Sequence, residues 1–177
     1  MRPVLTYSIL TIAAFAVQLN PGRVMALEKG EKARSPKGDA VSLGELHDQI
    51  VSALEGGEAK EAGSLLRLAL KTIRITKAKL SANDRAEWYL LEARVESARG
   101  RHANATLAAM KLVILMPDHA RVPEGLLWAA RGYEEMGRLN KAIDLYEECL
   151  GTKKLNAVLR VNAKESLRRL RERAAGQ

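Results

Sequence analysis

The chain has few aromatic residues, a single cysteine and no familiar catalytic motif, and each scarcity excludes a class of protein. Aromatic residues make up 4% of its 177 residues, which argues against a sandwich of β-sheets around an aromatic core. A single cysteine, Cys149, excludes an intramolecular disulfide framework and a thiolate metal cluster. The sequence contains no Gly-x-Ser-x-Gly, no His-Glu-x-x-His and no phosphate-binding glycine loop, so we do not expect an enzyme.

Metal and cofactor sites are equally unexpected. The three histidines, His47, His102 and His119, lack the spacing of a metal site, which needs several suitably placed ligands. We interpret them as solvated polar residues and Cys149 as a buried packing residue. We therefore predict no cofactor, no metal and no small-molecule substrate.

The first 26 residues have the pattern of an export signal. Arg2 precedes an uncharged apolar run at 4–17, and a helix-breaking stretch at 20–22 then leads to the small residue Ala26. This order is typical of a secretory signal peptide, here cleaved after Ala26. The run is shorter than the ~20 residues of a transmembrane helix. We expect a periplasmic or secreted protein, and the alternative is a membrane protein anchored by an uncleaved leader.

The remainder reads as a linker followed by helices. Residues 27–41 are charged and aperiodic, which predicts a flexible linker. From residue 42 onward, apolar residues recur at helical spacing and nothing alternates with period two, so the predicted class is all-α. Ser42 with Glu45 should cap the first helix, and Asn83-Asp84 the third. The predicted helical domain, 42–174, has hairpins at about 42–80, 84–116 and 122–150 and a capping helix at 155–174.

Three glycines share a sequence context. Alanine follows each of them five residues later, giving the pairs Gly57/Ala62, Gly100/Ala105 and Gly137/Ala142. Glycine permits a left-handed stop at the end of a helix, and alanine lets the next helix pack closely. Sliding 85–113 onto 122–150 gives seven identities in 29 positions. The glycine spacings of 43 and 37 residues imply insertions between repeats.

This pattern resembles the tetratricopeptide repeat family, in its exported bacterial form, whose unit is a helix–turn–helix of about 34 residues. The signature positions at 123–150 are occupied by Leu126, Ala130, Tyr133, Gly137, Ala142 and Tyr146. The unit at 85–117 has Glu96 where an aromatic residue is usual, and the unit at 43–74 keeps little beyond Gly57 and Ala62. The resemblance implies a right-handed solenoid of stacked hairpins. A plain antiparallel helical bundle is the alternative.

The resemblance also implies a binding surface, because the first helix of each hairpin lines the concave groove in this family. Carried over by repeat register, it assigns partner binding to Glu87, Leu90, Arg94, Glu124, Leu127, Arg131 and Glu134. Arg94 and Arg131 repeat one charge in one register, and their guanidinium groups could hold carboxylates or carbonyls of an extended peptide. The alternative is pairing within the chain, Arg94 with nearby glutamates and Arg131 with Glu134 or Glu135.

The net charge of +8 is concentrated near the end of the chain. Residues 151–177 carry eight basic and two acidic residues, whereas 27–150 sum to zero. Such a helix is attracted to an anionic membrane surface, and the candidate residues are Arg160, Lys164, Arg168, Arg169, Arg171 and Arg173. Nucleic acid is an improbable partner because no aromatic residue for base stacking follows Tyr146. A similar basic run comprises Arg67, Lys71, Arg74, Lys77 and Lys79, with no acid between 62 and 83.

We therefore expect an exported, non-enzymatic scaffold that binds a partner protein or peptide along the first helices of its hairpins, in cell-envelope assembly or maintenance. The alternative is a peripheral protein of an anionic membrane surface that uses its basic final helix. A third reading, a cytosolic helical protein associated with nucleic acid, requires the leader to be misread.

Overall fold

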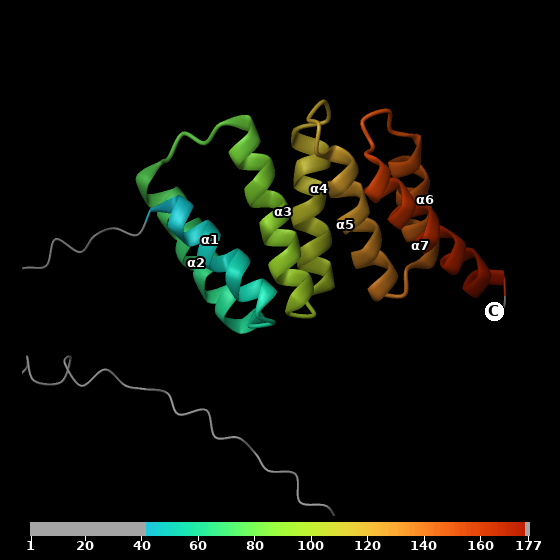
Figure 1. The fold of residues 1–177 in the computed structure, drawn as a ribbon, viewed down its shortest axis with the longest axis horizontal. Coiled ribbons are helices and arrows are strands. Elements are labelled where there is room, and N and C mark those ends of the chain that lie inside the picture. The colour runs from blue at the N-terminus through green and yellow to red at the C-terminus, as the bar shows by residue number, and fades with distance from the viewer. Residues whose placement is uncertain (1–41, 176–177) are drawn as a thin grey trace, which may run out of the picture. The chain divides into compact units, whose positions relative to one another are not determined.

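Seven α-helices and no strand make up residues 42–175, the part of the chain that this computed structural model describes (Figure 1). The helices are α1 (Leu43–Glu55), α2 (Ala59–Thr76), α3 (Ala82–Ala98), α4 (His102–Leu115), α5 (Val122–Glu135), α6 (Leu139–Gly151) and α7 (Ala157–Ala175). The predicted all-α class is confirmed for these residues. The expected leader and linker, residues 1–41, lie outside them.

Neighbouring helices pack in the order of the sequence. α1 pairs with α2, α3 with α4 and α5 with α6, and α7 packs on α6. The odd-numbered helices also contact one another in succession, from α1 through α3 and α5 to α7. Figure 1 shows this order as a run of colour from cyan at α1 to red at α7. The arrangement is repeat-like, and α7 follows the third hairpin in the place where a further odd helix would stand.

The turns inside the hairpins have the predicted glycine conformation. Gly57, Gly100 and Gly137 have φ angles of 76°, 70° and 71°, in the left-handed region that side chains disfavour. The capping box of α1 also forms, since Ser42 Oγ accepts from the amide of Glu45 at 3.1 Å and the Glu45 carboxylate accepts from the amide of Ser42 at 2.8 Å. Local sequence therefore fixes these ends.

The predicted cap of the third helix is wrong by two residues. α3 begins at Ala82, and its cap is Ser81, whose hydroxyl accepts from the amide of Asp84 at 3.1 Å. The Asp84 carboxylate accepts in turn from the Ser81 amide at 3.2 Å. The reason is that Ser81-x-x-Asp84 satisfies two amides reciprocally, which Asn83 could not do.

The final helix begins two residues later than predicted. Asn156 accepts from the amide of Leu159 at 2.8 Å, and α7 starts at Ala157. Leu155, 7% exposed, packs into the core ahead of the helix. None of the helices in residues 42–175 is both long and apolar enough to cross a membrane.

Two small-residue contacts bring α4 and α5 close together. A Cβ at Gly132 would lie 2.1 Å from Thr106 Oγ1, and one at Gly125 would lie 3.2 Å from the carbonyl oxygen of Ala109. Because both positions are glycine, the helix backbones approach more closely than larger residues allow. The second and third hairpins are thus joined by a close-packed junction.

Candidate functional site

The seven predicted partner-binding residues lie on α3 and α5, but two of them are in the core. Leu90 and Leu127 are 1% and 2% exposed. The next odd helix covers each leucine: α5 contributes Trp128 to the cluster around Leu90, and α7 contributes Ala163 to the cluster around Leu127. Both leucines are packing residues, and neither offers a side chain to a partner.

Glu87 and Glu124 are joined by a residue that the sequence did not single out. Arg121, just before α5, forms ion pairs with Glu87 on α3 and with Glu124 at 2.9 Å. On the other side of Glu87, His47 Nε2 of α1 lies 3.5 Å from its carboxylate. These contacts connect the N-terminal ends of α1, α3 and α5. No spacing rule indicated this, because the pairing depends on how the hairpins stack.

Glu134 holds three helices together. Its side chain is 10% exposed, it accepts from the hydroxyl of Tyr146 on α6 at 3.2 Å, and it pairs with Arg169 of α7 at 2.8 Å. Burial, with a smaller contribution from Glu134, raises the pKa of Tyr146 to about 12. The hydrogen bond to Glu134 raises the pKa of Arg169. Glu134 is therefore already engaged within the chain.

Arg94 and Arg131 differ from the three glutamates in their ion pairing. Both side chains are half-buried, and neither forms an ion pair with any residue in 42–175. The alternative given by the sequence, pairing of Arg131 with Glu134 or Glu135, is absent among these contacts. Its guanidinium carbon instead lies 5.2 Å from the ring centre of Trp128, within the range of a cation–π interaction. Two guanidinium groups on successive odd helices thus lack carboxylate partners in the described part of the chain.

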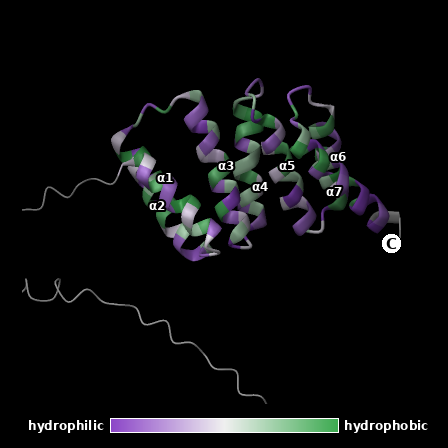
Figure 2. Ribbon diagram, viewed as in Figure 1, coloured by the Kyte–Doolittle hydropathy of each residue, from purple (hydrophilic) through white to green (hydrophobic). Residues whose placement is uncertain are grey.

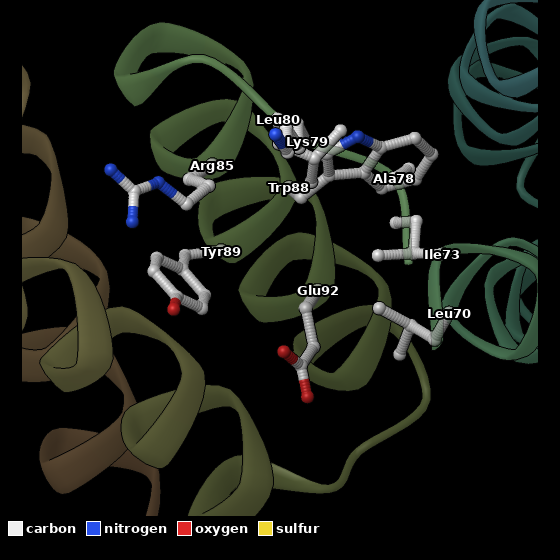
Figure 3. A pocket seen from close by; sticks show the side chains of 9 residues that line it. All are labelled: Leu70, Ile73, Ala78, Lys79, Leu80, Arg85, Trp88, Tyr89 and Glu92. Atoms are coloured by element: carbon white, nitrogen blue, oxygen red, sulfur yellow. The ribbon is translucent and has the colours of Figure 1, made fainter. Parts of the chain in front are cut away.

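The other side of α3 borders a pocket of about 510 Å³, shown in Figure 3. Leu70 and Ile73 of α2 form one wall, and Trp88 and Tyr89 of α3 form another. Ala78, Lys79 and Leu80 close one end, and Arg85 and Glu92 complete the lining. Since successive residues of a helix are about 100° apart, Arg85 and Glu92 lie opposite Glu87 and Arg94 on α3.

The pocket lining combines apolar and charged side chains. Lys111 of α4 pairs with Glu92 at 3.3 Å, which neutralises the one carboxylate of the lining, and Lys79 and Arg85 are exposed. Such a space suits an apolar side chain more than a reacting group. The sequence did not predict this pocket. Its one related feature was the 43-residue spacing of Gly57 and Gly100, which implied extra residues between the first two hairpins.

Most basic residues of α7 are paired with glutamates. Arg168 pairs with Glu172, Arg169 and Arg173 pair with Glu134, and Arg171 pairs with Glu147. Arg160 lies 3.5 Å from the carbonyl oxygen of Leu150. Lys164 is exposed and has no ion pair with the described residues. Figure 2 shows the last turns of α7 as largely hydrophilic.

The single thiol of the sequence lies in the core. Cys149 is fully buried beside the carbonyl oxygen of Pro123, at 3.3 Å, and burial raises its pKa to about 11. A thiol with a raised pKa is a poor nucleophile because little thiolate is present at neutral pH. Among residues 42–175, no three histidine, cysteine or acidic side chains are grouped as metal ligands.

Comparison with known proteins adds no relationship, because no family model matches the chain and no curated protein matches it significantly.

Proposed function

We propose that this chain is an exported, non-enzymatic scaffold that binds an acidic, extended segment of a partner protein along α3 and α5. The observation that carries the proposal is the pair Arg94 and Arg131, half-buried in the same repeat register on successive odd helices and without ion pairs to residues 42–175. Guanidinium groups bind carboxylates in two-pronged geometry and are frequent in the energetic centres of protein interfaces.

Trp128 strengthens the proposal. It lies beside Arg131, with the guanidinium 5.2 Å from the ring centre, and it remains partly exposed. Tryptophan and arginine together supply apolar contact and directed hydrogen bonds, the combination enriched in interface hot spots. Glu87, Glu124 and Glu134 are held by contacts within the chain, so the proposed binding residues are Arg94, Trp128 and Arg131.

The order of helix packing supports a tetratricopeptide-like solenoid as the frame of this surface. Its odd helices contact one another in sequence, and its three hairpin turns are left-handed glycines. A stack of such hairpins presents equivalent positions at a regular pitch, which suits an extended ligand. The right-handed superhelix is part of the proposal.

The proposed location is the periplasm or the exterior of the cell, with the leader removed after Ala26, and the proposed setting is cell-envelope assembly or maintenance. The support is the order of charge, apolar run and small residues at 1–26. Intact mass of the protein from soluble and membrane fractions tests this. A soluble species beginning at Leu27 supports export. A membrane species retaining Met1 would indicate that the leader anchors the protein in the membrane.

The binding surface is tested by charge reversal at both arginines, Arg94→Glu with Arg131→Glu. Cross-linking in the producing cell, followed by affinity purification, identifies partners of the unmodified protein. The double variant should bind those partners at least about 30-fold more weakly, because each arginine anchor contributes roughly 1–2 kcal/mol. The matched control, Lys153→Glu with Lys164→Glu, makes the same charge change at exposed sites away from α3 and α5.

Circular dichroism of both variants separates lost binding from lost folding. Unchanged partner capture by a helical Arg94→Glu/Arg131→Glu variant overturns the proposal. Equal loss in the control variant would instead indicate attraction by net charge alone, with no site at the two arginines.

The second candidate function, attachment to an anionic membrane surface through α7, has weaker support. Four of its six candidate cations already have a glutamate within 4 Å. Attraction to a bilayer depends on charge that is free to meet the headgroups. This pairing lowers the contribution that α7 could make.

A further inference from the structure

Among residues 42–175, the basic residues of α2 form no ion pair, whereas four of the six on α7 do. Arg67, Lys71 and Arg74 are exposed on α2, and none of them forms an ion pair with residues 42–175. Arg67 donates a hydrogen bond to the hydroxyl of Ser64 at 3.0 Å. Lys77 and Lys79, just after the helix, are likewise exposed, and no acidic residue occurs from 62 to 83. The charge of this segment is therefore uncompensated locally.

Large apolar side chains accompany these cations on the solvent side of the helix. Leu68 is 47% exposed and Ile75 is 65% exposed. They are seven residues apart, so they lie on one side of the helix two turns from each other. By the same spacing, Lys71 lies between them and the line formed by Arg67 and Arg74.

The opposite side of α2 fixes this orientation. Ala62, Leu66 and Ala69 are buried, with exposures of 0%, 3% and 0%, and pack into the cluster that α1 and α3 share. The solvent side therefore stays outward without any rearrangement of the fold. Hydrophobic side chains at 68 and 75 remain exposed because the core is already filled from the other side.

We infer that the solvent side of α2 is a docking surface for an anionic lipid bilayer. Arg67, Lys71 and Arg74 would meet the headgroup phosphates, while Leu68 and Ile75 would enter the boundary between headgroups and acyl chains. Cations on flexible stems beside apolar side chains suit the graded polarity of a bilayer surface. This surface is separate from Arg94 and Arg131, so the proposal is independent of the binding function proposed above.

Two features of the surface favour lipid over the other anionic partners. A nucleic-acid backbone would leave Leu68 and Ile75 in water, and the solvent side of α2 carries no aromatic residue for base stacking. An acidic region on a folded protein could attract the cations of α2. It would contact Leu68 and Ile75 only if it also had apolar side chains at matching positions. A bilayer supplies both environments along the whole helix.

Vesicle flotation tests the inference with the protein in the form in which the cell produces it. The probes are vesicles of phosphatidylglycerol mixed with phosphatidylcholine, and vesicles of phosphatidylcholine alone. Lys71→Gln with Arg74→Gln should weaken partition onto the anionic vesicles about 25-fold, because each basic side chain near such a surface contributes roughly a factor of five. The control, Arg168→Gln with Arg171→Gln on α7, makes the same charge change and should lower partition less than about threefold, because these arginines are already paired with Glu172 and Glu147.

A second variant tests the apolar part at constant charge. Leu68→Ser with Ile75→Ser should weaken partition about tenfold through lost apolar burial. Wild-type partition that does not depend on phosphatidylglycerol, or equal losses in the α2 and α7 charge variants, would overturn the inference. If the α2 variants keep full vesicle binding but lose an acidic protein partner, the occupant of this surface is that protein and not a bilayer.

Discussion

The junction between the first and second hairpins differs sharply from the junction between the second and third. At the later one, α4 and α5 approach so closely that Gly132 has no room for a Cβ beside Thr106. At the earlier one, α2 and α3 leave a pocket of about 510 Å³ lined by Ile73 and Trp88 (Figure 3). The same kind of unit is therefore packed tightly at one end of the described chain and loosely at the other.

The earlier junction also contains a polar cluster. Glu96 of α3, 8% exposed, pairs with Arg99 at 2.8 Å and lies 3.7 Å from Arg101. The Arg99 side chain crosses over Gly63 of α2, where a Cβ would lie 2.7 Å from its Nε. An ion pair on α3 thus reaches across to α2 of the first hairpin.

The two junctions show how repeat regularity controls packing. α2 has 18 residues against 14 in α4, and Ile73 in its last turn and residues 78–80 after it line the pocket. The regular junction closes on small residues and apolar contact. The irregular one combines apolar contacts of α2 with α3 and a largely buried ion pair, and it leaves space beside them.

The largest predicted effect breaks the tight junction. Gly132→Ala should lower the free energy of unfolding by about 3 kcal/mol, because the new methyl group overlaps Thr106 Oγ1 in a buried contact. Urea denaturation measures this. Adding Thr106→Ala to the same chain should restore most of the loss.

A helical glycine in open space provides the control for that experiment. Gly151, at the end of α6, has no heavy atom within 4 Å of an added Cβ. Gly151→Ala should therefore change the free energy of unfolding by no more than about 1 kcal/mol, in the stabilising direction. Equal effects at 132 and 151 would mean that α4 and α5 are not close-packed.

High pH should loosen the C-terminal hairpin, which belongs to the tightly packed half. Burial raises the pKa of Tyr146 to about 12 and of Cys149 to about 11, above their values in the unfolded chain. The unfolded chain therefore loses these protons first. The stability from both groups is full below pH about 8 and is lost as pH rises toward and through their folded pKa values, by about 3 kcal/mol at pH about 10.5.

The measurement is urea denaturation at several pH values between about 8 and 11. Tyr146→Phe with Cys149→Ala removes both titrating groups and should flatten the pH dependence, although it lowers stability at neutral pH through the lost hydrogen bond to Glu134. If the stability of this variant still falls steeply as the pH rises, other titrating groups cause the effect.

The loose junction should depend on its ion pair. Glu96→Ala leaves Arg99, whose side chain is 13% exposed, without its carboxylate at 2.8 Å. We expect the free energy of unfolding to fall by about 2 kcal/mol, since an unpaired and largely desolvated charge is costly. Glu172→Ala, which removes an exposed partner of Arg168 on α7, should cost less than about 0.5 kcal/mol. Similar costs at both sites would show that the Glu96 pair is no better shielded than a surface pair.

The sequence predicted what short-range chemistry controls. The glycine turns at 57, 100 and 137 and the Ser42 capping box form as expected, because each depends on residues at most three or four apart. The sequence did not predict the contacts between hairpins. Leu90 and Leu127 were assigned to a groove by register, yet both are buried, because the next odd helix lies close enough to cover them.

The same limit explains the site residues that sequence reasoning missed. Arg121 precedes α5 with no repeat counterpart, and its pairing with Glu87 exists only because α3 and α5 are stacked. α2 and α7 are both basic, but stacking places Glu134 and Glu147 against the arginines of α7, whereas no carboxylate within residues 42–175 pairs with Arg74 of α2. Charge composition alone could not distinguish them.

The smallest predicted effect is that of Gly63→Ala on the free energy of unfolding, whose sign should depend on whether Arg99 is present. It tests whether the Arg99 side chain is fixed against α2. An alanine inside a helix is ordinarily about 1 kcal/mol more stable than a glycine. At position 63, however, the Cβ would lie 2.7 Å from Arg99 Nε, so Gly63→Ala should destabilise the protein by about 1 kcal/mol. In an Arg99→Ala background the obstruction is gone, and the same change should stabilise by about 1 kcal/mol. A double-mutant cycle in urea measures the difference. If Gly63→Ala is stabilising in both backgrounds, the arginine moves aside freely and the loose junction is not fixed by its ion pair.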